Sequence, residues 1–277
     1  MAEAGRSALA HVPLDWLTPR RLKNRLARNR LLRDRHAGQR CFILGNGPSL
    51  ATQDLSGIAG EILISCNSGH VFTRSRGLAA TYHAVVDDVF ARHENAWFLD
   101  EMRELERAGT TLLTSLRIAD ALAARDAPEK VFAVHQILAS DFPRSRVDRM
   151  PDLTRAQFGY LSVIHMSIAC ALYMGFREIY LLGCDMDYFV DPQRTFEHSY
   201  GDARLGEGGL SASELFGWDQ VELMTWCLRE FRAFDALGRT AELNGRRIFN
   251  AGVGGALNVF PRVELERLVT VDRRRQA

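Results

Sequence analysis

The sequence contains no hydrophobic run that approaches the roughly 20 residues a helix needs to span a bilayer. It also has almost no net charge, because 35 Lys and Arg residues stand against 34 Asp and Glu residues. This balance provides no overall field for binding a polyanion, so we expect no nucleic-acid partner. A signal-peptide core is missing too, since the apolar stretch at residues 8–14 is short and contains His11 and Pro13. We therefore expect a cytoplasmic protein.

Cysteine occurs only five times, and no two cysteines have the spacing of a metal-binding pair. The positions are Cys41, Cys66, Cys170, Cys184 and Cys227. Four of them lie in apolar surroundings, which is typical of buried thiols in a reducing compartment.

Two common phosphate-binding fingerprints are absent as well. A tight turn follows the apolar residues 41–44, but a dinucleotide fingerprint would need a third glycine at Leu50, and no Gly-Lys-Ser/Thr of a P-loop follows. The turn consists of Gly45, Asn46, Gly47, Pro48 and Ser49. Its glycines permit positive φ angles and a close approach of the backbone to a ligand. Spacing alone leaves two interpretations open, a nucleotide or phosphate site and an ordinary tight turn.

Polar residues stand at the ends of several apolar runs. The segments at residues 41–46, 61–67 and 81–88 end near Asn46, Asn67 and Asp87, and residues 178–185 end in Asp185. Because the carboxyl ends of parallel strands share one edge of a sheet, these side chains are expected to meet. The sequence therefore predicts an α/β fold, with a Rossmann-like, mostly parallel sheet, helices on both faces and a C-terminal lid and helical region. The helix expected at 162–174 is apolar nearly all round and is predicted to be buried.

Basic residues are concentrated near the N-terminus. Residues 20–40 hold nine Arg or Lys residues against a single acid, Asp34, with leucines at near-helical spacing. The leucines are Leu22, Leu26, Leu31 and Leu32. The pattern predicts a basic amphipathic helix, which either binds a membrane surface or acidic partner or packs its leucines on the domain.

The chain divides into three parts. Residues 1–39 form a basic N-terminal helical extension, residues 40–270 a single Rossmann-like catalytic domain, and residues 271–277 a tail. Within the domain, the polar, Gly-rich segment at about 189–216 has the length of a lid or binding loop. A membrane role of the extension would make the protein peripheral to the inner membrane.

Several segments together resemble a known superfamily. They are residues 44–49, Cys66 with Asn67, Asp87, residues 162–185 and residues 250–262, which follow Asn-Ala-x-x-Gly-Gly-x-Leu-x-x-Phe-x-Arg. The resemblance is to the domains of unknown function 115, which include the flagellin-modifying motility accessory factors. The archaeal 6-hydroxymethylpterin diphosphokinase is similar to these. Bacterial α-2,3/2,8-sialyltransferases that use CMP-sialic acid share the Gly-Asn-Gly-Pro-Ser start and a Gly-aromatic-basic-Glu-Ile-Tyr-Leu segment.

The resemblance to the sialyltransferases implies a donor site. Asn46, with the turn around it, and Asn67 would hold the nucleotide sugar, and Asp87 would contact donor or acceptor. Ser162 would be the hydroxyl that touches the donor at the start of the buried helix. The sialyltransferases have Thr-Ser-Gly at this point, whereas here Val163 and an isoleucine follow Ser162.

The resemblance also implies catalytic residues. A His in the polar loop would act as general base, and His198 is the only His after Asp185. Tyr188 and Tyr200 would assist the departing phosphate, and Asp185 completes the catalytic set. His83 and His165 lie within apolar runs and are expected to be satisfied core residues.

Three functions remain open from the sequence. The first is a glycosyltransferase with a nucleotide-sugar donor, CMP-sugars among them, and a glycan or protein acceptor; it requires no metal. The second is a pyrophosphokinase of the pterin type, which would need Mg²⁺ held by Asp87, Asp185 and Asp187, with Asp88 nearby. The third is a non-catalytic nucleotide-sugar-binding component of a glycan-assembly complex.

Overall fold

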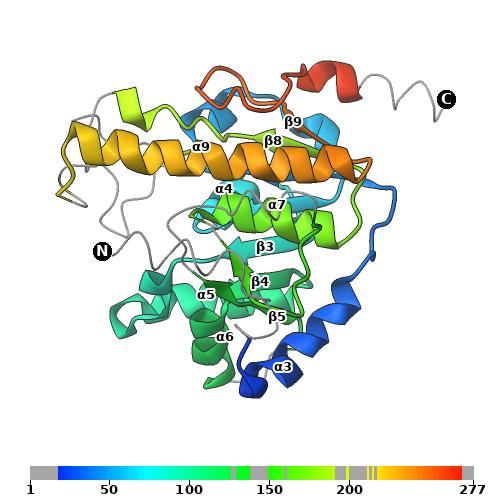
Figure 1. The fold of residues 1–277 in the computed structure, drawn as a ribbon, viewed down its shortest axis with the longest axis vertical. Coiled ribbons are helices and arrows are strands. Elements are labelled where there is room, and N and C mark those ends of the chain that lie inside the picture. The colour runs from blue at the N-terminus through cyan, green and yellow to red at the C-terminus, as the bar shows by residue number, and fades with distance from the viewer. Residues whose placement is uncertain are drawn as a thin grey trace.

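The structure is a computed structural model that describes residues 18–125, 129–137, 149–158, 161–190, 198–199, 211, 214 and 217–269. Its centre is a seven-stranded sheet in the order β5-β4-β3-β2-β1-β8-β9, in which every neighbouring pair is parallel. The strands are β1 (Arg40–Leu44), β2 (Leu63–Cys66), β3 (Tyr82–Val85), β4 (Thr111–Ser115), β5 (Val131–Val134), β8 (Glu178–Leu182) and β9 (Arg247–Asn250). A separate parallel pair joins β6 (Gln136–Ile137) to β7 (Gln157–Phe158). The predicted α/β, Rossmann-like fold is confirmed (Figure 1).

The strand order reverses at β1. The chain first builds outward from β1 through β2, β3 and β4 to β5, and then places β8 and β9 on the other side of β1. Leu44 pairs with Ser65 on one side and with Leu182 on the other, so the carboxyl ends of β1, β2 and β8 lie side by side. Open parallel sheets bind ligands in the crevice beyond the carboxyl ends at such a switch point.

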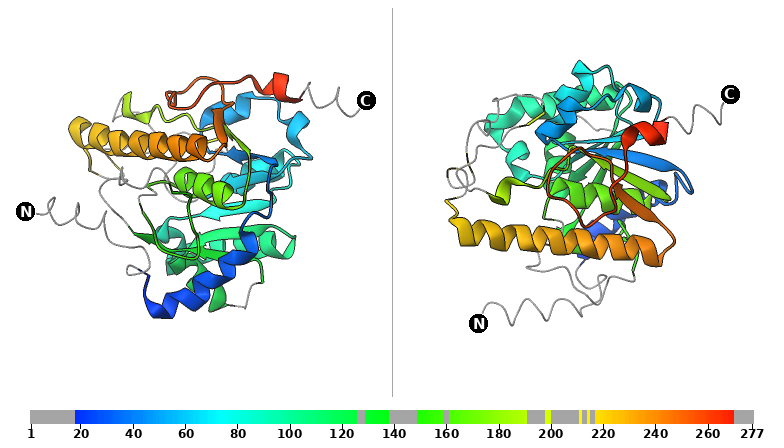
Figure 2. Two further views of the ribbon diagram at one scale, coloured as in Figure 1. Left: turned by 45° about the vertical axis from the view of Figure 1, so that its right-hand side comes forward. Right: turned by 90° about the horizontal axis from the view of Figure 1, so that it is seen from above.

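Helices cover both faces of the sheet. α7 (Val163–Tyr173) packs against β1, β2 and β3, and α9 (Gln220–Leu243) lies beside α7 (Figures 1 and 2). All of α7 is buried, as its apolar sequence predicts. On the other face lie α4 (Gly69–Ser75), α5 (Ala96–Arg107) and α6 (Leu116–Ala123). The side chains of β1 alternate between the two cores, with Ile43 on the α7 face and Phe42 on the other.

Helix α5 does not follow β3 directly. It begins at Ala96, after 3₁₀ turns at Asp88–Ala91 and His93–Asn95. Such turns are frequent where a helix starts, because i→i+3 hydrogen bonds tighten the chain. The last helical segment that the structure describes covers residues 265–269.

The basic N-terminal helix is shorter than predicted and is docked on the domain. α3 (Arg20–Ala27) continues as a 3₁₀ helix, η2 (Arg28–Leu32), rather than as one helix to residue 40. Leu26, at the end of α3, and Asn29 and Leu32 in η2 are each three residues apart. This spacing matches one 3₁₀ turn, so they lie on the same side of the segment, and all three are buried. Leu31 is 67% exposed, so the leucines do not form one continuous outer face.

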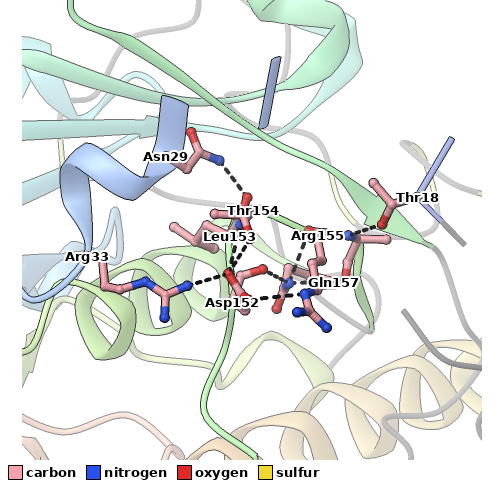
Figure 3. A network of polar contacts seen from close by, with 9 residues as sticks. Thr18, Asn29, Arg33, Asp152, Leu153, Thr154, Arg155 and Gln157 are labelled. Carbon is pink, nitrogen blue, oxygen red and sulfur yellow. Dashed lines mark hydrogen bonds and ion pairs between the residues drawn. The ribbon is translucent and has the colours of Figure 1, made fainter. Parts of the chain in front are cut away.

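Polar contacts fasten this segment beside β5 (Figure 3). The Asn29 side-chain amide donates to the carbonyls of Ala133 and Leu153, at 2.8 and 2.7 Å. Arg33 pairs with Asp152 at 3.1 Å. These contacts support packing on the domain as one function of the segment.

Two further expectations concern the environment of the chain. In the part that the structure describes, no helix is long and apolar enough to cross a membrane. All five cysteines are buried free thiols, as predicted.

Candidate functional site

The polar residues that end the strands do meet at the carboxyl edge of the sheet. The Asn67 side-chain amide donates to the Asp87 carboxylate at 3.2 Å, and the Asn46 amide donates to the Cys66 carbonyl at 3.2 Å. The side-chain oxygens of Asn46 and Asn67 are buried without a hydrogen-bond partner among the described residues. Buried polar atoms are rarely left unpaired, so each amide oxygen marks a place where a further hydrogen-bond donor would be favourable.

The space beside the two glycines of the turn is filled by another segment of the protein, the loop that follows β8. Neither Gly45 nor Gly47 has a positive φ angle, contrary to the freedom expected of them. A Cβ atom on Gly45 would lie 2.4 Å from the Gly183 carbonyl oxygen, and one on Gly47 would lie 2.5 Å from an Asp185 carboxylate oxygen. The glycines therefore allow close contact with the loop after β8.

Asp185 holds this contact together. Its carboxylate accepts hydrogen bonds from the Ser49 backbone N–H, at 3.0 Å, and from the Ser49 hydroxyl. Pro48 begins the 3₁₀ helix Pro48–Thr52, a position that needs no N–H donor. The geometry gives Asp185 and Ser49 a clamping role on the turn.

A cavity of about 800 Å³ opens beside this edge. Five of the predicted site residues line it, and they come from four separate segments. These residues are Asn67, Asp87, Ser162, Tyr188 and His198.

The other predicted residues lie elsewhere. The turn residues and Asp185 are not part of the cavity wall. Asn46 lies behind it, where its carbonyl accepts the Ser199 N–H at 2.8 Å. Tyr200 lies outside the described residues, as does most of the predicted lid at 189–216.

Burial shifts the pKa of two cavity residues. It lowers the pKa of His198, although a hydrogen bond with the Asn46 backbone acts the other way. His198 is therefore neutral at pH 7 and able to accept a proton. Burial raises the pKa of Asp87; the hydrogen bond from Asn67 opposes this and the nearby Asp88 carboxylate adds to it.

Sequence reasoning missed the contribution of α9. Glu230 lies on the cavity wall, is only 3% exposed and accepts a hydrogen bond from the Tyr188 hydroxyl. Burial raises the pKa of Glu230 to about 7. Trp218 and Trp226 line the same part of the cavity. The signal was present, because Glu230 falls in the apolar stripe of the helix, between Cys227 and Phe234.

His165 links α7 to α9. Its Nδ1 accepts the Ser162 backbone N–H at 3.1 Å, and its Nε2 faces the Glu230 carbonyl oxygen at 3.1 Å. A carbonyl can only accept, so the proton of the ring lies on Nε2. Burial lowers the pKa of His165 to about 4. The ring is thus a satisfied core residue, as predicted, and it fixes the start of α7 at the cavity.

The carboxylates are divided between two places. Asp87 and Asp88 line the cavity. Asp185 instead accepts a hydrogen bond from the Ser49 hydroxyl, and Asp187 is not on the cavity wall. Among the described residues, no three His, Cys, Asp or Glu side chains lie close enough together to hold a metal ion.

Comparison with known proteins identifies the family. The family model described as 6-hydroxymethylpterin diphosphokinase MptE-like matches residues 20–191. The chain belongs to the MptE-like family. This membership confirms the expected superfamily. The matched range includes the segments that carry Asn46, Asn67, Asp87 and Ser162. A search of curated proteins found no match.

A solved structure shares the fold of this MptE-like chain. It is described as the MAf glycosyltransferase from Magnetospirillum magneticum AMB-1, with a TM-score of 0.51 and 18% sequence identity. The match covers 92% of this chain and 42% of the other, so the chain spans less than half of that protein's length. At this identity the similarity shows a common fold.

Proposed function

We propose that the chain is a glycosyltransferase that transfers sugar from a nucleotide-activated donor to a glycan or protein acceptor. Membership of the MptE-like family and the fold shared with a protein described as a glycosyltransferase support this. The observation that carries the proposal is His198, a neutral histidine on a cavity wall that also holds Asn67, Asp87 and the start of α7.

The chemistry follows from these residues. His198 accepts the proton of the acceptor hydroxyl, whose oxygen bonds to the anomeric carbon of the donor. The bond from that carbon to the phosphate oxygen breaks, and the nucleotide leaves with the electron pair. The backbone N–H groups at the start of α7, after Ser162, suit the negative charge of the departing phosphate. In this scheme the transfer requires no metal.

CMP-linked sugars are the first donors to test, in line with the resemblance to the sialyltransferases. The unpaired side-chain oxygen of Asn67, a residue of the cavity wall, can accept a hydrogen bond, and a nucleoside offers amino and hydroxyl donors. The hydroxyl of Tyr188 donates to Glu230, so in this arrangement it is already engaged. A role of Tyr188 or Tyr200 at the departing phosphate stays a prediction.

A diphosphokinase is the second candidate, because the family description names one. The observation that favours it is the pair Asp87 and Asp88 on the cavity wall, whose oxygens are ligands that Mg²⁺ prefers. Mg²⁺ would there neutralise the phosphates of ATP. A binding protein without turnover is the third candidate.

A thermal-shift screen separates these functions. The purified chain is heated with CMP, CDP, UDP, GDP, ADP or ATP, each with and without Mg²⁺, and a ligand of the native state raises the melting temperature. Stabilisation by CMP without metal supports the glycosyltransferase, and it should weaken in Asn67→Ala but not in the control Asn24→Ala on the exposed side of α3. Stabilisation by ATP only with Mg²⁺ would overturn it in favour of the diphosphokinase.

Turnover distinguishes an enzyme from a binding component. With a stabilising nucleotide known, release of that nucleotide from its sugar conjugate is measured for the parent, His198→Ala and the exposed-histidine control His93→Ala. Loss of a general base should lower turnover by about 10²-fold or more. Binding without any turnover in the parent would favour the non-catalytic component.

Contact with a membrane surface is a separate proposal. Arg20, Arg21 and Lys23 are exposed on α3, whereas Arg25 and Arg33 are paired with Asp120 and Asp152. Replacing the three exposed cations by Glu should abolish co-sedimentation with phosphatidylglycerol vesicles. Equal co-sedimentation of parent and variant would contradict the proposal.

A further inference from the structure

One end of the cavity is built from aromatic rings. Trp218, just before α9, and Trp226, two turns into it, both line the cavity together with Leu223. The two indole rings are 5.3 Å apart between centroids and tilted by 37°. A third ring between them would need about 7 Å, twice the contact distance of carbon atoms, so a ligand must lie against the pair from the cavity side.

The same end holds a buried carboxyl group. The Glu230 side chain accepts hydrogen bonds from the Tyr188 hydroxyl and from Trp226. These contacts fix the position of the carboxyl group and of the Tyr188 and Trp226 rings. Because Glu230 also lines the cavity, its oxygens can accept further hydrogen bonds from a ligand.

We propose that Trp218, Trp226 and Glu230 form a subsite for a pyranose ring of the acceptor. The proposal rests on the function proposed above and makes the acceptor a glycan rather than a protein side chain. A pyranose has a face of C–H groups that packs on an indole ring and a rim of hydroxyls that donate to a carboxylate. Both features are matched at this end of the cavity.

The residues assigned to donor and acceptor lie on different elements around one cavity. Its volume of about 800 Å³ lies within the range of about 300–1,000 Å³ found for sites that take a drug-sized ligand. Asn67 and Asp87 come from the sheet edge, whereas Trp218, Trp226 and Glu230 come from α9 and the segment before it. His198 lines the same cavity, as a base that acts on the acceptor hydroxyl requires.

A flat heteroaromatic ligand such as guanine is the alternative occupant of this end, because its amidine-like edge can donate to both oxygens of a carboxylate. The Tyr188 hydroxyl already donates to one oxygen of Glu230, which keeps a second lone pair. Guanosine is therefore the comparison ligand in the test below.

Binding of sugars without nucleotide tests the subsite directly. The probes are the methyl glycosides of galactose, N-acetylglucosamine and N-acetylneuraminic acid, with guanosine as the heteroaromatic comparison. Ligand-observed NMR and tryptophan fluorescence measure their binding to the full chain, with and without CMP. Variants are Trp218→Leu, Trp226→Leu and Glu230→Gln, and the matched control is Trp97→Phe on α5, away from the cavity. Melting temperatures show that each variant is folded.

We expect at least one glycoside to bind, with affinity reduced 10-fold or more in each tryptophan variant, about 5-fold or more in Glu230→Gln, and unchanged in Trp97→Phe. The melting-temperature shift given by nucleotide should persist in these variants. If no glycoside binds, or if guanosine alone binds and depends on Trp226, the proposal is wrong, even where CMP still stabilises the chain. If a glycoside binds but no nucleotide changes the melting temperature, the sugar subsite is supported and the assignment of a nucleotide-sugar donor is wrong.

Discussion

Replacing Asp185 tests whether this residue clamps the turn or takes part in chemistry. The structure gives its carboxylate two hydrogen bonds from Ser49, one from the backbone N–H and one from the hydroxyl. In Asp185→Ala both are lost, and in Ser49→Ala only the hydroxyl bond is lost. The two variants should therefore differ in stability by about one hydrogen bond.

The magnitude follows from the kind of bond. A hydrogen bond to a charged group contributes about 1.5–3 kcal/mol, and because both residues are only partly buried we take the lower figure. Asp185→Ala should then lower the free energy of unfolding by about 3 kcal/mol and Ser49→Ala by about 1.5 kcal/mol. At about 2–4 °C per kcal/mol for a chain of this size, the melting temperature falls by about 6–12 °C and 3–6 °C.

Urea denaturation of the two single variants and the double variant measures these values. The double variant should be no less stable than Asp185→Ala, which gives a coupling of about 1.5 kcal/mol. Asp235→Ala, which removes an exposed ion pair with Arg239, is the control and should change stability by less than about 0.5 kcal/mol. An Asp185→Ala protein as stable as the parent but 100-fold slower in turnover would refute the clamping role.

Three further experiments, two with variants and one with the parent, test other parts of the structure. Asn29→Ala leaves the buried carbonyls of Ala133 and Leu153 without their donor and should cost about 2–4 kcal/mol in urea denaturation, whereas a loss below about 0.5 kcal/mol would show that the N-terminal segment is not anchored there. Because burial keeps the pKa of His198 below 6.5, the acid limb of the turnover profile should be centred below pH 6.5; an acid limb centred above pH 7 would contradict its role as base. The pKa of Glu230 is raised from 4.5 to about 7, so the folded state binds more protons between these values and parent stability falls as pH rises. Glu230→Gln should therefore gain about 3 kcal/mol on the parent between pH 4 and pH 8, and a pH-independent difference would refute this.

Much of the fold follows from local pattern. The apolar runs that form β1, β2, β3 and β8, and the largely apolar α7, can each be located within a few residues, because burial on both sides leaves few polar positions. Parallel strands share a carboxyl edge, so the meeting of Asn46, Asn67 and Asp87 could be expected before any coordinates. The family resemblance added Ser162 and His198, and both line the cavity with Asn67 and Asp87.

Other features depend on which distant segments touch. Whether Gly45 and Gly47 face a ligand or the chain cannot be read from the turn, and the structure fills their open sides with the loop after β8. The break from α3 into a 3₁₀ helix follows from the partners of Asn29, more than 100 residues away in sequence. Local propensity gives no information about such partners.

The sequence by itself thus determined the α/β class, the meeting of polar strand ends at one edge of the sheet and the family, because these follow from periodicity and motif. Only the tertiary structure decided that Asp185 binds Ser49 while Asp87 lines a cavity, and that α9 brings Glu230 and two tryptophans to that cavity. The physical reason is that burial and hydrogen bonding set the charge and the role of a polar side chain. Both are properties of its neighbours in space, which the order of residues along the chain does not state.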